Sequence, residues 1–308
     1  MRDNLRPGGS CRRRARARSS CAIVLPLVPS RSSFLSPMRP ARFIPFVAAV
    51  AVLAAPAALA AQSAPPVFID ELTWTEIRDR QQAGTRSVII GTAGQEQKGP
   101  HMVDGEHKYV LEHTTARIAR TLGDALVAPV ITYVPEGSWD PPRGHMTKPG
   151  TITLPEDRFV ELLLHAGRSL KAGGFTQVIY IGDSGGNQRG MQKAAEQLNT
   201  EWAGSARALF IGDYYTKASE AMRVMLRGRG FTDEDIGSHA GMLDTSELLY
   251  VNPRLVRKDR LARNGGAPDS GVNGDPTKAS AELGAELLTI KIDHALAQIR
   301  ALRTGGAK

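Results

Sequence analysis

The sequence predicts an α/β protein whose mostly parallel sheet is covered by helices on both faces. Apolar, strand-like runs alternate with segments of helical spacing along most of the chain. Parallel strands need long crossover connections, which are usually helices, so this alternation is typical of a parallel sheet. The roughly 250 residues that follow an N-terminal leader also suit one domain with a large core.

The first part of the folded chain predicts two helices and two strands. Residues 71–81 have helical spacing with Ile77 on the apolar side, and the apolar run 87–91 predicts a buried strand. Apolar residues at helical spacing predict a second helix over 110–121. Residues 125–134 are strand-like.

The middle of the chain predicts a long loop followed by helix, strand and helix. Residues 135–150 are rich in Pro and Gly, and a loop of this length is a candidate wall of a site. Residues 155–171 have the spacing of an amphipathic helix. The two glycines that follow are a typical signal for the end of a helix. Residues 178–181 predict a strand and residues 187–202 a helix.

The C-terminal part completes the alternating pattern. Residues 206–211 predict a strand, residues 217–227 a helix, and the short apolar run 247–251 another strand. A loop rich in Gly, Asp and Pro over 265–276 precedes a long helix over 279–302.

The net charge of +8 comes from the leader. The first 60 residues hold ten of the 39 Lys and Arg and one of the 31 Asp and Glu. The remaining residues therefore carry 29 basic and 30 acidic side chains. A nearly neutral domain gives no electrostatic reason to expect nucleic acid, so we predict no nucleic-acid partner.

Residues 38–60 have the features of a secretory signal peptide. Arg39 and Arg42 supply the positive region, and residues 43–55 form a short apolar region. Ala58-Leu59-Ala60 fits a cleavage site, and the apolar run is too short to span a bilayer comfortably. We expect cleavage after Ala60 and a periplasmic or secreted protein that has no membrane attachment once the signal is removed.

This interpretation divides the chain into four parts. We expect residues 1–37 to be an upstream extension or the product of a mis-called start codon. The signal peptide at 38–60 is followed by a Pro/Ala-containing linker at 61–69 and by the folded domain at 70–308.

A cluster of polar residues follows the predicted strand 87–91. It contains Glu96, Lys98, His101 and His107 within one short span. Open α/β sheets place their chemistry at the C-terminal ends of strands, and two imidazoles are unusual in an ordinary solvated loop. The cluster therefore predicts a functional site.

The sequence Gly182-Asp183-Ser184-Gly185-Gly186 joins a predicted strand to a predicted helix. The same five residues contain the nucleophile of chymotrypsin-like proteases, but those are all-β proteins with disulfides. Here the flanking elements differ, and both cysteines, Cys11 and Cys21, lie in the leader. The mature chain therefore has no disulfide and no thiolate nucleophile.

The nucleophile elbow of α/β-hydrolases matches this strand–turn–helix better. His239 follows Ser184 in the required chain order, with Asp233 or Asp235 between them as the acid. However, no HGGG-type oxyanion motif lies upstream. The glycines also have a simpler explanation, since they allow a sharp turn under a helix N-terminus that can bind an anion.

Five segments together resemble the creatininase (creatinine amidohydrolase) family. In chain order they are EQKGPH at 96–101 with His107, His145 before PGT at 149–151, IGDSGGN at 181–187, HAGMLDTS at 239–246 and GVNGDPT at 271–277. The resemblance implies a three-layer α/β/α sandwich, often oligomeric, so a homo-oligomer is compatible with it. It also implies a two-metal site that hydrolyses amide bonds, many of them cyclic.

The chain departs from the family's pattern at most metal-ligand positions. The family's first motif, Glu-x-His-Gly-x-His, has Lys98 at its third position. The family's bridging aspartate falls at His107, and the histidine of its NGHGGN motif falls at Ser184. Both glutamates of HAGExETS are replaced, one of them by the shorter Asp244, so that only Glu96 is retained in type.

These replacements argue against a two-metal site. A ligand that bridges two metal ions is normally a carboxylate, whereas a neutral imidazole has one free nitrogen. The ammonium of Lys98 can hold Glu96 where a metal would sit. One divalent ion, Zn²⁺ or Mn²⁺, remains compatible with the sequence, bound by Glu96, His107 and a carboxylate of Asp183 or Asp244.

We therefore expect an exported amidohydrolase that cleaves a C–N bond of a small-molecule amide, cyclic amides included. A water activated by one metal or by a carboxylate attacks the carbonyl, whose oxygen is stabilised by Lys98, the metal or backbone N–H groups. The expected catalytic residues are Glu96, Lys98 and Ser184. The expected substrate contacts are His101, His145, Gly185, Gly186, Asn187 and His239.

Two alternatives remain open at this point. One is a serine hydrolase that uses Ser184 as its nucleophile. The other is a non-catalytic binding protein that keeps the cleft without the chemistry. Loss of the matched metal ligands favours the binding protein, and the polar type of the replacing residues favours an enzyme.

Overall fold

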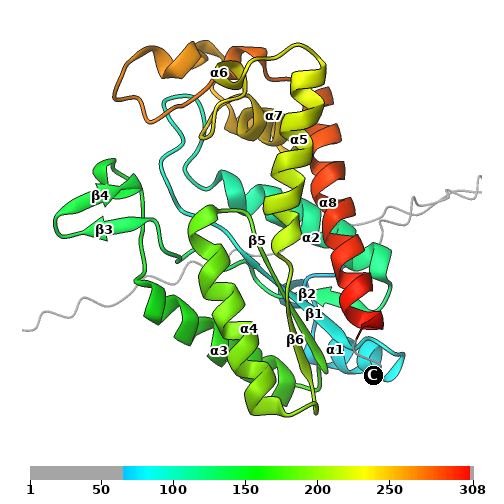
Figure 1. The fold of residues 1–308 in the computed structure, drawn as a ribbon. Helices are drawn as coiled ribbons and strands as arrows, with labels where there is room; N and C mark the ends of the chain where they lie inside the picture. The colour runs from blue at the N-terminus through cyan, green and yellow to red at the C-terminus, as the bar shows by residue number, and fades with distance from the viewer. Residues whose placement is uncertain (1–64, 306–308) are drawn as a thin grey trace, which may run out of the picture. The chain divides into compact units, whose positions relative to one another are not determined.

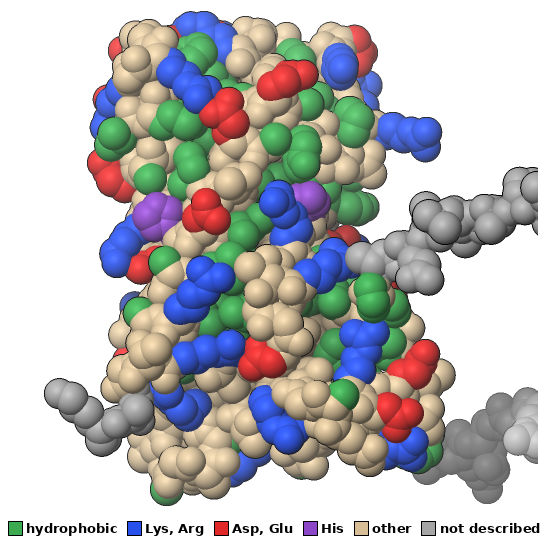
Figure 2. Space-filling model, turned by 90° about the vertical axis from the view of Figure 1, so that its right-hand side faces the viewer, with side chains coloured by type: hydrophobic (Ala, Val, Ile, Leu, Met, Phe, Trp, Pro, Cys, Tyr) green, Lys and Arg blue, Asp and Glu red, His purple; other side chains and the backbone are tan. Residues whose placement is uncertain are grey.

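The computed structural model describes residues 65–305. The expected extension at 1–37 and the signal peptide at 38–60 lie outside the described residues. Across 65–305, the helices are all too short or too polar to cross a bilayer. Figure 2 shows basic and acidic side chains interspersed over one face, as expected for a chain of nearly neutral charge after its leader.

A four-stranded parallel sheet forms the middle of the fold, with the strand order β2-β1-β5-β6. Its strands are β1 (Ser87–Thr92), β2 (Ala125–Val127), β5 (Gln177–Gly182) and β6 (Arg207–Phe210). The expected strand at 125–134 is much shorter in the structure. Pro129 follows β2 closely and has no N–H to donate, so regular pairing stops before it.

Helices cover both faces of the sheet and make the three layers (Figure 1). One face is covered by α3 (Glu156–Ala172) and α4 (Gln188–Trp202). The other is covered by α2 (Glu106–Leu122) and α8 (Ala281–Thr304). The expected α/β/α architecture is confirmed.

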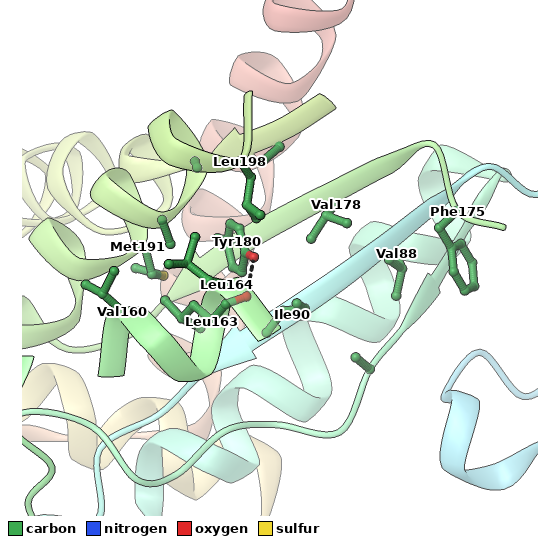
Figure 3. Close-up of a cluster of buried hydrophobic side chains, with 14 of the residues drawn as sticks. Val88, Ile90, Val160, Leu163, Leu164, Phe175, Val178, Tyr180, Met191 and Leu198 are labelled. Atoms are coloured by element: carbon green, nitrogen blue, oxygen red, sulfur yellow. Dashed lines mark hydrogen bonds between the residues drawn. The ribbon is translucent and has the colours of Figure 1, made fainter. Parts of the chain in front are cut away.

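Alternate residues of each strand supply the two cores. Val88 and Ile90 of β1 pack with α3 and α4, whereas Ile89 between them packs with α2 and α8. Figure 3 shows the first core, in which the Tyr180 hydroxyl donates to the Leu163 carbonyl at 2.8 Å. Burying one such aliphatic side chain contributes roughly 1.5–3 kcal/mol. Because both faces are buried, the strands are apolar throughout instead of alternating with polar residues.

The N-terminal edge of the described chain joins the sheet. Helix α1 (Trp74–Gln82) begins with a capping box in which Thr73 and Glu76 bond to each other's backbone N–H groups. Before it, Val67 is buried and Phe68 forms a parallel bridge to Val127. The last residues of the expected linker at 61–69 therefore pack as part of the fold.

Three further helices lie above the sheet in Figure 1: α5 (Thr216–Gly228), α6 (Asp233–Ile236) and α7 (Met242–Val251). The expected strand at 247–251 is wrong, because these residues are the second half of α7. A short apolar run does not distinguish a strand from a buried helix, and packing against α8 decides. Gly284 permits this packing, since a Cβ there would lie 2.0 Å from the Ser246 carbonyl oxygen.

The expected loop at 135–150 contains a small hairpin that extends from the domain (Figure 1). Its antiparallel strands are β3 (Gly137–Trp139) and β4 (Pro142–Gly144), followed by a 3₁₀ turn at His145–Thr147. This segment places His145 beside the loop that follows β1, so it forms a wall of the site as expected.

Candidate active site

A cavity of about 650 Å³ opens where the loops after β1 and β5 meet α7 and the β3–β4 segment. Its lining includes Glu96, His107, Ser184 and Asp244, which come from four different segments. The loop after β1 is held in shape by backbone bonds, with the Glu96 N–H donating to the Asp104 carbonyl at 3.2 Å. The parallel sheet thus brings distant motifs to one edge.

Lys98 lies at the centre of a buried charge network, with 1% of its side chain exposed. Its Nζ is 3.0 Å from Asp244 Oδ2, 3.1 Å from Glu96 Oε1 and 3.3 Å from Glu106 Oε2. Burial alone would lower the pKa of Lys98, but these carboxylates raise the pKa well above its ordinary value. Lys98 is therefore a permanent cation.

His107 is the second cation of the network. Its Nε2 lies 2.8 Å from Glu96 Oε1, and its Nδ1 lies 3.0 Å from Glu106 Oε2 and 3.2 Å from Asp183 Oδ2. Burial opposes the charged form, but the three carboxylates raise the pKa of His107 well above its ordinary value. Since both nitrogens face carboxylate oxygens, both carry protons and the ring is an imidazolium.

Helix α2 begins four residues earlier than the sequence predicts, and this start places Glu106 and His107 in its first turn. Gly105 precedes the helix, and a glutamate in the first turn suits the positive helix end. Sequence reasoning therefore assigned both residues to a loop and missed the role of Glu106.

Sequence reasoning also missed a third cation, Lys291 of α8. Its Nζ lies 2.7 Å from Asp183 Oδ1 and 2.6 Å from Glu247 Oε2. Burial would lower the pKa of Lys291, but these partners raise the pKa well above its ordinary value. The signal was available, because a lysine between two isoleucines on an apolar helix face needs buried acidic partners.

Two carboxyl groups of the cavity are held in opposite protonation states. Burial favours the neutral form of Glu96, yet Lys98 and His107 lower the pKa of Glu96 far below its ordinary value. Burial and the neighbouring charge of Glu96 raise the pKa of Glu136 to about 9. At neutral pH Glu96 is ionised and Glu136 keeps its proton. Nothing in the sequence around Glu136 indicated this role.

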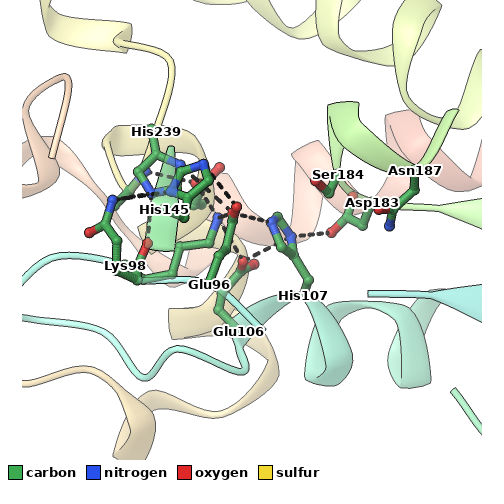
Figure 4. Close-up of polar contacts among 12 residues, drawn as sticks. Glu96, Lys98, Glu106, His107, His145, Asp183, Ser184, Asn187 and His239 are labelled. Atoms are coloured by element: carbon green, nitrogen blue, oxygen red, sulfur yellow. Dashed lines mark hydrogen bonds and ion pairs between the residues drawn. The ribbon is translucent and has the colours of Figure 1, made fainter. Parts of the chain in front are cut away.

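His145 and His239 lie on the side of Glu96 away from His107 (Figure 4). His145 Nε2 is 3.1 Å from Glu96 Oε2, and the two imidazole rings are 4.5 Å apart. His239 Nε2 lies 2.7 Å from the Gln97 carbonyl oxygen. Burial and Lys98 lower the pKa of His239 to about 4, so this ring is neutral.

The turn after β5 lines the cavity with Ser184, Gly185 and Gly186. Gly186 is required by close packing, because a Cβ there would lie 2.6 Å from the Pro135 carbonyl oxygen. The hydroxyl of Ser184 has no histidine partner among residues 65–305, since the nearby His107 and His239 bond elsewhere.

Two of the expected substrate contacts do not reach the cavity. His101 is fully buried, with Nε2 3.0 Å from the Thr245 hydroxyl. Asn187 is also fully buried, and its Nδ2 donates to the Thr92 carbonyl at 3.1 Å. The structure gives both side chains a role in holding loops, and it leaves His145, Gly185, Gly186 and His239 in the cavity wall.

The model of the creatininase family, described as creatinine amidohydrolase, matches residues 70–299. The chain belongs to the creatininase family. This confirms the resemblance carried by the five sequence segments, and it makes the protein an amidohydrolase, which is a class of hydrolase.

Curated relatives and solved structures agree with this assignment. A mycofactocin precursor peptide peptidase of Mycobacterium ulcerans is 26% identical over 243 residues, covering 69% of this chain and 84% of that protein. A creatinine amidohydrolase of Pseudomonas putida is 27% identical over 205 residues, covering 63% and 75%. A manganese creatininase structure superposes with a TM-score of 0.62 at 23% identity, covering 77% of this chain and 98% of that one. A mutant creatininase of the Zn–Zn type gives a TM-score of 0.63 at 23% identity and the same coverages.

The residues present do not fit the two-metal centre that this family implies. The ammonium of Lys98 already contacts three carboxylates at 3.0–3.3 Å, and His107 is a cation where the family has a bridging carboxylate. The carboxylates expected from the sequence to bind a single metal are also paired with different lysines. Asp244 contacts Lys98, and Asp183 contacts Lys291. Side-chain cations thus neutralise carboxylates that metals would otherwise hold.

Replacement of Glu247 by Gln is expected to change how stability depends on pH. Burial raises the pKa of Glu247 to about 8, compared with about 4.3 in an unfolded chain. Between these values the folded state binds more protons, so the free energy of unfolding falls as pH rises from about 4 to about 8. Glu247→Gln removes this contribution. The difference in free energy of unfolding between the variant and the native chain should therefore grow in favour of the variant as pH rises over that range.

Chemical denaturation between about pH 5 and pH 8 measures this difference. Glu220→Gln, at an exposed position of α5, is the matched control and should show no such trend. A stability difference between Glu247→Gln and the native chain that stays constant with pH would contradict the raised pKa.

Proposed function

We propose that the protein hydrolyses a C–N amide bond of a small molecule, cyclic amides included, inside the 650 Å³ cavity. The observation that carries this proposal is the grouping of Glu96, Glu136, His145 and His239 in one wall. An ionised carboxylate beside a protonated one is the usual arrangement for acid and base work at neutral pH. The volume lies within the roughly 300–1,000 Å³ of small-molecule sites.

Each part of the reaction has a group in the cavity wall. The polar edge formed by Glu96, His145 and His239 binds the attacking water. A histidine of this edge takes up its proton, because the lowered pKa of Glu96 makes that carboxylate a weak base. The water oxygen bonds to the carbonyl carbon, and the carbonyl oxygen is stabilised by backbone N–H groups of the turn after β5, because the three N–H donors of Lys98 already face carboxylates. Glu136 donates its proton to the leaving nitrogen as the C–N bond breaks. The products are a carboxylic acid and an amine.

The relatives' names support this reaction class. One is named a peptidase and another a creatinine amidohydrolase. Both names describe cleavage of a C–N bond next to a carbonyl-type carbon, in a linear chain and in a ring. We propose a small amide substrate for this chain on that ground together with the size of the cavity.

Ser184 is proposed to line the site without acting as a covalent nucleophile. A nucleophilic serine needs a histidine within hydrogen-bond reach and an acid behind it. Both nitrogens of His107 face carboxylates, and His239 Nε2 faces the Gln97 carbonyl. The hydroxyl therefore has no base positioned to remove its proton.

A fluorophosphonate probe combined with assays on an amide panel tests this assignment. We expect no labelling of the native protein, amide hydrolysis in the native protein and in Ser184→Ala, and strongly reduced hydrolysis in Glu96→Gln. Stoichiometric labelling that is lost only in Ser184→Ala would establish the serine hydrolase instead. Absence of hydrolysis by the native protein across cyclic and linear amides would favour the non-catalytic binding protein.

We also propose that the protein is exported and begins near Ala61. The support is the charged and apolar pattern of residues 38–60, which lie outside the described residues. N-terminal sequencing of protein from its natural host decides this, and a mature chain that retains Cys11 would refute it.

A further inference from the structure

We infer that Glu96, His145 and His239 form a binding site for a single divalent transition-metal ion at the edge of the cavity. This ligand set shares only Glu96 with the set expected from the sequence. It places the ion on the outer side of Glu96, away from Lys98 and His107. The inference rests on the proposed function for the role of the ion, but not for its binding.

The spacing of the three side chains suits one ion. His145 Nε2 lies 3.1 Å from Glu96 Oε2, and His239 Nδ1 lies 3.8 Å from Glu96 Oε1. One donor atom from each residue lies within 4.8 Å of the other two. Ligands at roughly 2.0–2.2 Å from a tetrahedral ion are roughly 3.3–3.6 Å apart. Small side-chain movements are therefore enough to bring the three donor atoms to coordination distance of one ion.

His239 is already oriented as a ligand. Its Nε2 lies 2.7 Å from the Gln97 carbonyl oxygen, which can only accept a hydrogen bond. Nε2 also lies 3.1 Å from the Gln97 side-chain amide nitrogen, but the shorter contact to the carbonyl oxygen places the ring proton on Nε2 and leaves the lone pair of Nδ1 facing Glu96. A backbone carbonyl that fixes the tautomer of a histidine is a common outer partner in metal sites.

The inner group formed by Glu106, His107 and Asp183 is the other group with suitable spacing in residues 65–305. It is not available to an ion, because both nitrogens of His107 already face carboxylates. Lys98 lies 3.3 Å from Glu106 and Lys291 lies 2.7 Å from Asp183. An ion there would displace cations that the chain itself provides.

The charge of the network favours a further cation. Three cationic side chains, Lys98, His107 and Lys291, contact or adjoin six carboxyl groups. These are Glu96, Glu106, Glu136, Asp183, Asp244 and Glu247. Glu136 and Glu247 keep their protons at neutral pH, so four carboxylates at most face the three cations and the excess is one negative charge. This excess stabilises a bound cation, and Lys98 contacts Oε1 of Glu96 and not Oε2.

An ion can reach this edge from solvent. The side chains of His145 and His239 are 31% and 18% exposed, and both also line a neighbouring opening beside Gly271. Two imidazoles and one carboxylate form a donor set that suits Zn²⁺. Such an ion would lower the pKa of a water bound at the position where the proposed reaction needs one.

Metal titration of the purified, chelator-treated protein tests the site without any substrate. We expect one Zn²⁺ per chain by calorimetry, and a visible absorption band when Co²⁺ replaces Zn²⁺. His145→Ala and His239→Ala should each weaken binding by more than the roughly 10- to 100-fold typical of losing an outer partner. His165→Ala removes an exposed histidine of α3 and should bind as the native chain does.

Three results would overturn the inference: no saturable binding, two ions per chain, or binding that survives both alanine variants and is lost in His107→Ala. The last result would place the ion in the inner group. Binding as expected in a protein that hydrolyses no amide would support the ion site and count against the proposed function. The two failures are therefore distinguishable.

Discussion

Lys98→Met is expected to lower the free energy of unfolding by about 3–5 kcal/mol, the usual cost of removing one partner from a buried ion pair. The substitution keeps the length of the side chain but removes the ammonium from three carboxylates. Glu106 is affected most, because its carboxylate is almost fully buried and would keep His107 as its remaining cationic partner within residues 65–305. The loss should decrease at acid pH, where carboxylates that have lost the ammonium take up protons instead.

Thermal and chemical denaturation measure this loss, and Lys108→Met is the matched control. Lys108 lies on α2, where it pairs with Glu112 at the surface, so its loss should cost less than about 1 kcal/mol. Adding Glu106→Gln to Lys98→Met should restore part of the stability, because it removes a buried carboxylate that has lost one of its two cationic partners. Equal stability losses in Lys98→Met and Lys108→Met would contradict the central role of the ammonium.

Glu96→Gln should reduce kcat/KM on an amide substrate by about 10²- to 10⁴-fold, because the histidine base and the attacking water lose the carboxylate that positions them. The change preserves shape but removes the charge that lies between His107 on one side and His145 on the other. Glu136→Gln should lower kcat by a similar factor, because an amide cannot donate a proton to the leaving nitrogen as a carboxylic acid does. Because the raised pKa of Glu136 lowers the free energy of unfolding at neutral pH, as it does for Glu247, this second variant should be at least as stable as the native chain.

Steady-state kinetics on a substrate found in the amide panel provide the measurement, together with circular dichroism to confirm folding. Glu112→Gln, a surface change on α2, is the control and should leave kcat/KM unchanged. Hydrolysis by Glu96→Gln at the native rate would remove Glu96 from the reaction. Native kcat in Glu136→Gln would assign the leaving-group proton to another donor.

Local pattern was enough to predict most of the fold. The apolar runs of β1 and β5 are recognisable because both of their faces are buried. The motifs that follow them are recognisable because a parallel sheet gathers strand ends at one edge. The prediction of a strand at 247–251 was wrong because four apolar residues are compatible with both a strand and a buried helix. Contact with Gly284 on α8 decides between them.

The sequence by itself determined the architecture, the family and the identity of several cavity residues, because strand and helix periodicity and short motifs are local properties. Only the tertiary structure decided how their charges are arranged. Lys291 and Glu247 come from helices distant in sequence from Asp183, and burial makes their pairing obligatory. Likewise, His145 and His239 become partners of Glu96 only when the β3–β4 segment and the residues before α7 fold over the same strand end. Protonation states and ligand groups depend on distances between such segments, and a linear pattern does not contain those distances.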